Sequence, residues 1–149
     1  MKYSIFVFIL AASLIAASAF GSEGGGWLTD FEKALKQAEE KDRPILVDFS
    51  GSDWCGWCIK LDKEVFSRDA FKEYAKDNLV LFLADFPSRK EIPREVKEQN
   101  EKLAKKYGIR GFPTVLLLDA EGDVIARTGY RRGGADKYVE HIKGLIQDD

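Results

Sequence analysis

A compact apolar run leading into a closely spaced cysteine pair constrains the fold of this chain more than any other feature. Residues 45–49 read Ile-Leu-Val-Asp-Phe, and a run of this length and composition predicts a strand buried inside a sheet. Cys55 and Cys58 follow after a short connection, at the start of a helical pattern that continues through residues 61–66. The two cysteines are therefore expected where a strand ends and a helix begins.

That position gives the two sulfur atoms different chemistry. At a helix N-terminus, the sulfur of Cys55 would lie near unpaired backbone N–H groups and the positive end of the helix dipole. Both favour the thiolate, which is the form of cysteine that attacks disulfides. Cys58 would lie one helical turn further on, within reach of Cys55. The spacing predicts a redox-active pair, because a purely structural disulfide here would close too short a loop to stabilise the fold much.

A metal site is the second interpretation of the cysteine pair. Closed zinc sites take four ligands, whereas the chain has two cysteines and a single histidine, His141, far along the sequence. A two-thiolate copper(I) site stays open because soft metals accept sulfur ligands, although Met1 is the only methionine.

Hydrophobic periodicity and turn residues divide the rest of the chain into helices and strands. Further strands are predicted at residues 79–84, 114–118 and 124–128. Helices are predicted around residues 31–38, 70–75, 94–107 and 135–146. The order predicts an α/β fold: a central mixed, mainly parallel sheet with helices on both faces, closed by a C-terminal β-hairpin and helix.

Residues 1–19 have the features of a secretory signal peptide. Lys2 precedes an uncharged, mostly apolar stretch that ends in Ala17-Ser18-Ala19, a typical cleavage site. The alternative is an uncleaved membrane anchor, because the uncharged stretch approaches the length that spans a bilayer. Residues 20–27 are expected to form a flexible linker, and residues 28–149 the folded domain. The expected location is periplasmic or secreted, or membrane-anchored if the segment is not cleaved.

Composition and charge exclude two classes of partner. With 45% apolar and 32% charged residues, the 149-residue chain is typical of a single ordered globular domain. Its formal net charge is −2, and it has no long basic run. There is therefore no electrostatic basis for binding nucleic acid or an anionic membrane surface.

Two motifs make the chain resemble the thioredoxin superfamily. The first is the strand ending in Asp48-Phe49 with the following Trp54-Cys55-Gly56-Trp57-Cys58, and the second is Gly111-Phe112-Pro113-Thr114. The resemblance covers residues 28–146 in element order and is strongest to exported, single-domain bacterial thioredoxin-like proteins. It implies a thioredoxin fold and thiol–disulfide exchange with protein thiols and disulfides, with no bound cofactor.

The resemblance also implies a role for each residue of these motifs. Cys55 would attack a substrate disulfide, and Cys58 would displace the reduced product. Asp48 would exchange a proton with Cys58, since an acid inside an apolar strand has a raised pKa unless it faces solvent at a sheet edge. Pro113 would form a cis peptide bond, and the backbone of Phe112 would pair with an extended substrate segment. The other residues implied to contact substrate are Trp54, Gly56 and Trp57.

The chain departs from the thioredoxin pattern around the cysteines. Trp57 replaces the usual proline, and the connection from Asp48 to Cys55 is one residue longer. Trp54 either joins the apolar substrate surface or packs under this loop. No basic residue lies between the cysteines, which favours a reductase over a strong oxidase.

A separate redox partner, for example a membrane electron carrier, would recycle such a reductase. The rival function is binding, either as a copper(I) carrier or as a thioredoxin-like interaction module with an idle disulfide.

Overall fold

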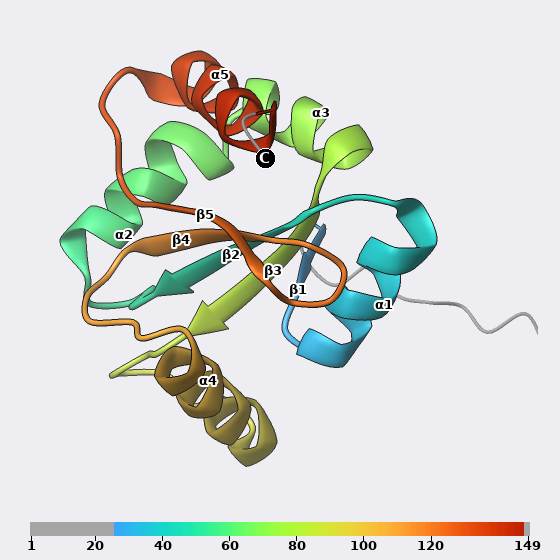
Figure 1. The fold of residues 1–149 in the computed structure, drawn as a ribbon. Coiled ribbons are helices and arrows are strands. Elements are labelled where there is room, and N and C mark those ends of the chain that lie inside the picture. Colours follow the sequence, from blue (N-terminus) through green and yellow to red (C-terminus); the bar gives the residue numbers. More distant parts are fainter. Residues whose placement is uncertain (1–25, 148–149) are drawn as a thin grey trace, which may run out of the picture.

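The protein folds into a five-stranded mixed sheet with helices on both faces (Figure 1). A computed structural model describes residues 26–147. The strands are β1 (Trp27–Leu28), β2 (Ile45–Ser50), β3 (Val80–Asp85), β4 (Thr114–Leu118) and β5 (Val124–Thr128), in the spatial order β1-β3-β2-β4-β5. The helices are α1 (Phe31–Lys41), α2 (Gly56–Leu61), the π-helix η2 (Asp62–Phe66), α3 (Asp69–Asn78), α4 (Arg94–Lys106) and α5 (Gly134–Gln147).

Strand β2 lies at the centre of the sheet, and all six of its residues are buried. Ile45, Val47 and Phe49 pack in the apolar layer that includes α1 and α4. Leu46 packs in the opposite layer, with residues of α2, η2, α3 and α5. Successive side chains of a strand point to opposite faces, so Asp48 enters the same layer as Leu46. Figure 1 shows these two helical layers on opposite sides of the sheet.

The sheet is mixed, as predicted, but it has one more antiparallel pair than the closing hairpin alone supplies. Among the described residues, β1 with β3 and β3 with β2 pair in parallel, whereas β2 with β4 and β4 with β5 pair antiparallel. The sequence order suggested that α4 returns the chain for a parallel strand. Instead, residues 107–113 lead the chain to the end of β2, where Thr114 pairs with Phe49 and β4 starts in the opposite direction.

Two local features also differ from the sequence expectations. Trp27, assigned to the linker, lies in β1, and its ring packs 5.1 Å from that of Phe66. The helical pattern after the cysteines becomes the π-helix η2 from Asp62 onward. The predicted signal peptide and residues 20–25 of the linker lie outside the described residues. Between residues 26 and 147, no helix is long and apolar enough to cross a membrane.

Candidate active site

The cysteine pair lies where β2 gives way to α2, as the sequence predicts. The backbone N–H of Cys55 donates to the carbonyl of Gly51 at 2.8 Å, which closes a turn between the strand and the helix. Cys55 is the N-cap of α2, and its Sγ accepts a hydrogen bond from the N–H of Cys58 at 3.3 Å. The two cysteines form a disulfide. The sulfur of Cys55 is thus held at a helix N-terminus, the setting that favours a thiolate.

Cys58 lies deeper than its partner. Its residue is 4% exposed, against 7% for Cys55, and its Sγ accepts from the N–H of Gly51 at 3.5 Å. Gly51 has no room for a side chain, because a Cβ there would lie 2.6 Å from Nε1 of Trp54. The connection from β2 to α2 therefore folds tightly around the disulfide.

Asp48 is buried beneath this connection rather than at a sheet edge. The residue is 6% exposed, and its Oδ1 has no hydrogen-bond partner among the described residues. Burial, helped by the nearby negative charges of Asp62 and Asp85, raises the pKa of Asp48 to about 8. Near neutral pH this carboxyl can therefore both hold and release a proton.

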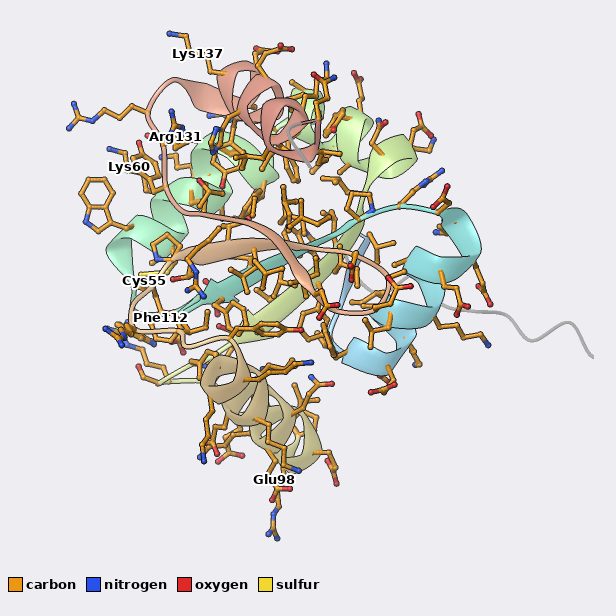
Figure 2. The ribbon with its side chains drawn as sticks, viewed as in Figure 1. Cys55, Lys60, Glu98, Phe112, Arg131 and Lys137 are labelled. Carbon is orange, nitrogen blue, oxygen red and sulfur yellow. A yellow bond between two sulfur atoms is a disulfide. The ribbon has the colours of Figure 1, made fainter. Side chains whose placement is uncertain are left out.

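The second motif reaches the cysteines from β4. The Phe112–Pro113 peptide bond is cis, as the resemblance implied. The ring of Phe112 packs edge-on against Trp54, with ring centroids 5.9 Å apart, and Trp54 directly precedes Cys55. Figure 2 shows Cys55 and Phe112 at the same end of the sheet. Strand pairing and this aromatic contact thus bring the two motifs together.

The two tryptophans of the site are both about half exposed, at 47% for Trp54 and 53% for Trp57. Trp54 packs on Phe112 and donates from Nε1 to the carbonyl of Phe86 at 2.7 Å, and its contact with substrate stays a prediction. Gly56, between Cys55 and Trp57, is exposed and has nothing within 4 Å of its would-be Cβ. The surface around Cys55 is therefore apolar and open.

Trp57 has partners that the sequence did not reveal. Its ring lies 5.0 Å from that of Tyr130, and Nζ of Lys60 lies 5.2 Å from the Trp57 centroid. The hydroxyl of Tyr130 donates to Glu64 at 2.7 Å. Because Tyr130 is far from the cysteines in sequence, only the fold could place it here.

The loop after β3 is held by side chains of the connection that leads to the cysteines. The carboxylate of Asp53 accepts hydrogen bonds from the backbone N–H groups of Ser88, Arg89 and Lys90, at 2.9, 2.7 and 3.0 Å. Asp85 accepts from the N–H and hydroxyl of Ser52. Ser52 and Asp53 lie at least 33 residues from these partners in sequence, so only the fold could bring them together.

Comparison with known proteins decides the family. The thioredoxin-like domain family matches residues 31–143. The chain belongs to that family. This confirms the resemblance inferred from the two sequence motifs.

Named relatives of this thioredoxin-like protein include a disulfide bond reductase and a thiol:disulfide interchange protein. The chain is 35% identical to the disulfide bond reductase DsbH of Chlamydia pneumoniae, over 78% of this chain and 70% of that protein. It is 32% identical to the thioredoxin-related protein DsbJ of the same organism and 31% identical to the thiol:disulfide interchange protein DsbD of Yersinia enterocolitica. Those matches cover 78% and 79% of this chain but only 34% and 19% of the relatives. The protein is a thioredoxin-like thiol–disulfide oxidoreductase with a Cys-x-x-Cys pair.

Solved structures confirm the thioredoxin fold. The structure of a DsbH oxidoreductase superposes with a TM-score of 0.78 at 35% identity, covering 81% of this chain and 83% of the other. The C-terminal domain of Neisseria meningitidis DsbD in its oxidised form superposes with a TM-score of 0.52 at 22% identity, covering 77% and 92%. The second likeness concerns the fold alone.

The copper(I) alternative can be compared with the side chains around the disulfide. Within residues 26–147, no three His, Cys, Asp or Glu side chains are grouped so that they could hold a metal ion.

Replacing Asp48 by asparagine should change how stability depends on pH. Because burial raises its pKa to about 8, the folded protein keeps a proton on Asp48 that the unfolded chain releases near pH 4. The free energy of unfolding of the wild type therefore falls as pH rises between these values. Asp48→Asn has no carboxyl at this position, so its free energy of unfolding lacks this decrease. The free energy of unfolding of the variant minus that of the wild type should therefore rise by about 1.4 kcal/mol per pH unit between these values.

Urea unfolding of the disulfide form at several pH values from 4 to 8 measures this difference. Asp77→Asn, at an exposed position near the end of α3, is the matched control and should keep a constant difference from wild type. A constant difference for Asp48→Asn as well would show that the buried carboxyl does not titrate as described.

Proposed function

We propose that this protein is an exported reductase of protein disulfides, working through Cys55 and Cys58. The observation that carries the proposal is the placement of Cys55 at the start of α2, with its sulfur facing the N–H of Cys58 and an apolar, open surface around it. The nearby buried acid and the named reductase among its relatives add support.

The reaction begins from the dithiol form. The Cys55 thiolate attacks one sulfur of a substrate disulfide, so that a mixed disulfide forms and the first substrate sulfur leaves as a thiolate that takes up a proton. Cys58 then loses its proton and attacks the sulfur of Cys55. This breaks the mixed disulfide, releases the second substrate thiol and leaves a Cys55–Cys58 disulfide. Two electrons and two protons pass to the substrate.

Asp48 serves the second step as a proton acceptor for Cys58. Its side chain enters the layer that contains α2, the helix on which Cys58 lies, and a pKa near 8 suits proton exchange with a thiol. A carboxyl with an ordinary pKa would be a much weaker base. The burial of Asp48 therefore has a chemical use that offsets its cost to stability.

The residues between the two cysteines support a flow of electrons towards substrates. Strongly oxidising pairs stabilise their reduced form, which lowers the pKa of the attacking cysteine. Here the residues between the cysteines are Gly56 and Trp57, and neither carries a positive charge. This setting favours donation of electrons to substrates.

Substrate chains would bind across the apolar surface beside Cys55. Trp54 and Trp57 supply exposed aromatic area, and Gly56 leaves the approach to the sulfur free. The backbone of Phe112, before cis Pro113, is available to pair with an extended segment. Protein disulfides are thus the proposed substrates.

The proposed location is the periplasm or the cell exterior, with residues 1–19 as the cleaved signal. An oxidising compartment does not keep a dithiol reduced, so a redox partner must resupply electrons. We assign that role to a membrane electron carrier, the class that can bring reducing equivalents across the membrane. Similarity to part of the interchange protein DsbD is consistent with this kind of relay.

Single cysteine variants test the mechanism. Cys55→Ser should reduce the rate of insulin disulfide reduction to background, because the attacking sulfur is lost. Cys58→Ser should instead accumulate mixed disulfides with its substrates, visible on a non-reducing gel and released by a thiol reductant. The double variant is the control for non-specific capture. Equal residual activity in both single variants would contradict the assigned roles.

Mass spectrometry of the protein from an exporting bacterial host tests the location. Cleavage after Ala19 should leave a chain that begins at Phe20 and is found in the periplasmic or culture fraction. The control is Ala17→Leu with Ala19→Leu, which removes the small residues of the cleavage site and should block processing. Full-length wild-type protein in the membrane fraction would instead support the uncleaved anchor.

A further inference from the structure

The loop of residues 86–90 borders the cysteine pair. Its first residue, Phe86, donates its N–H to the carbonyl of Ser50, the last residue of β2, at 2.8 Å. The ring of Phe86 packs 5.1 Å from that of Phe112, and its carbonyl accepts from Nε1 of Trp54. The loop therefore lies alongside the two residues that flank the entrance to Cys55.

The shape of this loop depends on one side chain. Residues 87–92, all within the described part of the chain, make no backbone-to-backbone hydrogen bond. Oδ1 of Asp53 accepts from the N–H of Ser88, while Oδ2 accepts from those of Arg89 and Lys90. Three successive N–H groups thus converge on a single carboxylate.

The charge of Asp53 is maintained by these same contacts. The hydrogen bonds from Ser88, Arg89 and Lys90 hold the pKa of Asp53 below its ordinary value. A second contact holds the same loop. Nζ of Lys90 forms an ion pair with Asp85 at 3.1 Å, and the carboxylate of Asp85 also accepts two hydrogen bonds from Ser52. Ser52 and Asp53 belong to the connection that is one residue longer than in ordinary thioredoxins. The longer connection thus holds the start and the middle of the loop.

We propose that Asp53 is a positioning residue, which holds the loop of residues 86–90 in the shape that receives an extended protein segment bound along Phe112. The inference rests on the proposed function and adds to it a structural basis for preferring protein disulfides over small ones. Residues 88–90 are exposed, so their surface is open to a bound chain.

The physical argument concerns the cost of ordering the loop. A protein substrate that extends beyond its disulfide contacts the loop as well as Cys55, and a loop already held in shape loses little conformational freedom on binding. Without Asp53, the backbone N–H groups of Ser88, Arg89 and Lys90 would form hydrogen bonds with water instead. The loop would then have to be ordered each time a substrate binds. A small disulfide reaches Cys55 without contacting residues 88–90 and is indifferent to this change.

Two substrates measured on the same variant separate these effects. For Asp53→Ala, the KM for insulin disulfide reduction should rise about three- to tenfold with little change in kcat. The rate at which the reduced variant consumes oxidised glutathione should stay within about twofold of wild type, because Asp53 does not touch the reacting sulfurs. Amide exchange of Ser88, Arg89 and Lys90 should become faster.

Two further variants complete the experiment. Asp53→Asn keeps one acceptor oxygen and should give an intermediate KM, which provides a test if Asp53→Ala folds poorly. Asp119→Ala is the matched control: Asp119 accepts backbone N–H groups of Glu121 and Asp123 in the turn at the opposite end of the sheet, so its loss should leave the KM for insulin unchanged.

An unchanged KM for insulin in both Asp53 variants would overturn the inference while the proposed function stands. Equal losses toward insulin and glutathione would also overturn it, since Asp53 would then act on the cysteine chemistry or on the fold. A wild-type protein that reduces neither substrate would refute the proposed function itself, and the inference with it.

Discussion

The register of the central strand β2 is the constraint on which the rest of the site depends. At its C-terminal end, Ser50 pairs with Asp85 of β3 and Phe49 pairs with Thr114 of β4. Three segments distant in sequence therefore meet at one edge: the connection to the cysteines, the loop after β3 and the cis-proline segment before β4. A slip of one residue would turn every side chain of β2 to the other face, so burial on both faces fixes this meeting point.

The same strand explains why the protein tolerates an acid in its core. An apolar residue in place of Asp48 would fill the layer beneath α2 without the cost of burying a carboxyl that lacks a full set of hydrogen bonds. The strand places that carboxyl in the layer of Cys58, and burial brings its pKa into the range of thiol chemistry. On the proposed mechanism, stability and function therefore depend in opposite ways on one side chain.

Local patterns predicted most elements, because apolar runs bounded by Gly and Pro define β2 to β5 and helical periodicity defines α1, α4 and α5. They could not predict β1, since a strand of two residues has no period, nor the direction of β4, which depends on where the chain re-enters the sheet. The motifs indicated the cysteines, Asp48 and cis Pro113. The contacts of Trp57 with Tyr130 and of Asp53 with residues 88–90 join distant segments, so they emerged only from the fold.

The reduction potential of the chain without residues 1–19 tests the central claim most directly. It is measured by equilibration with glutathione buffers followed by thiol trapping and mass analysis. The lack of a positive charge between the two cysteines predicts a value near that of thioredoxin, about −270 mV, as a disulfide reductase requires. A value near about −120 mV would contradict this account, because such a pair donates disulfides. A pair that never equilibrates with glutathione would contradict redox catalysis altogether.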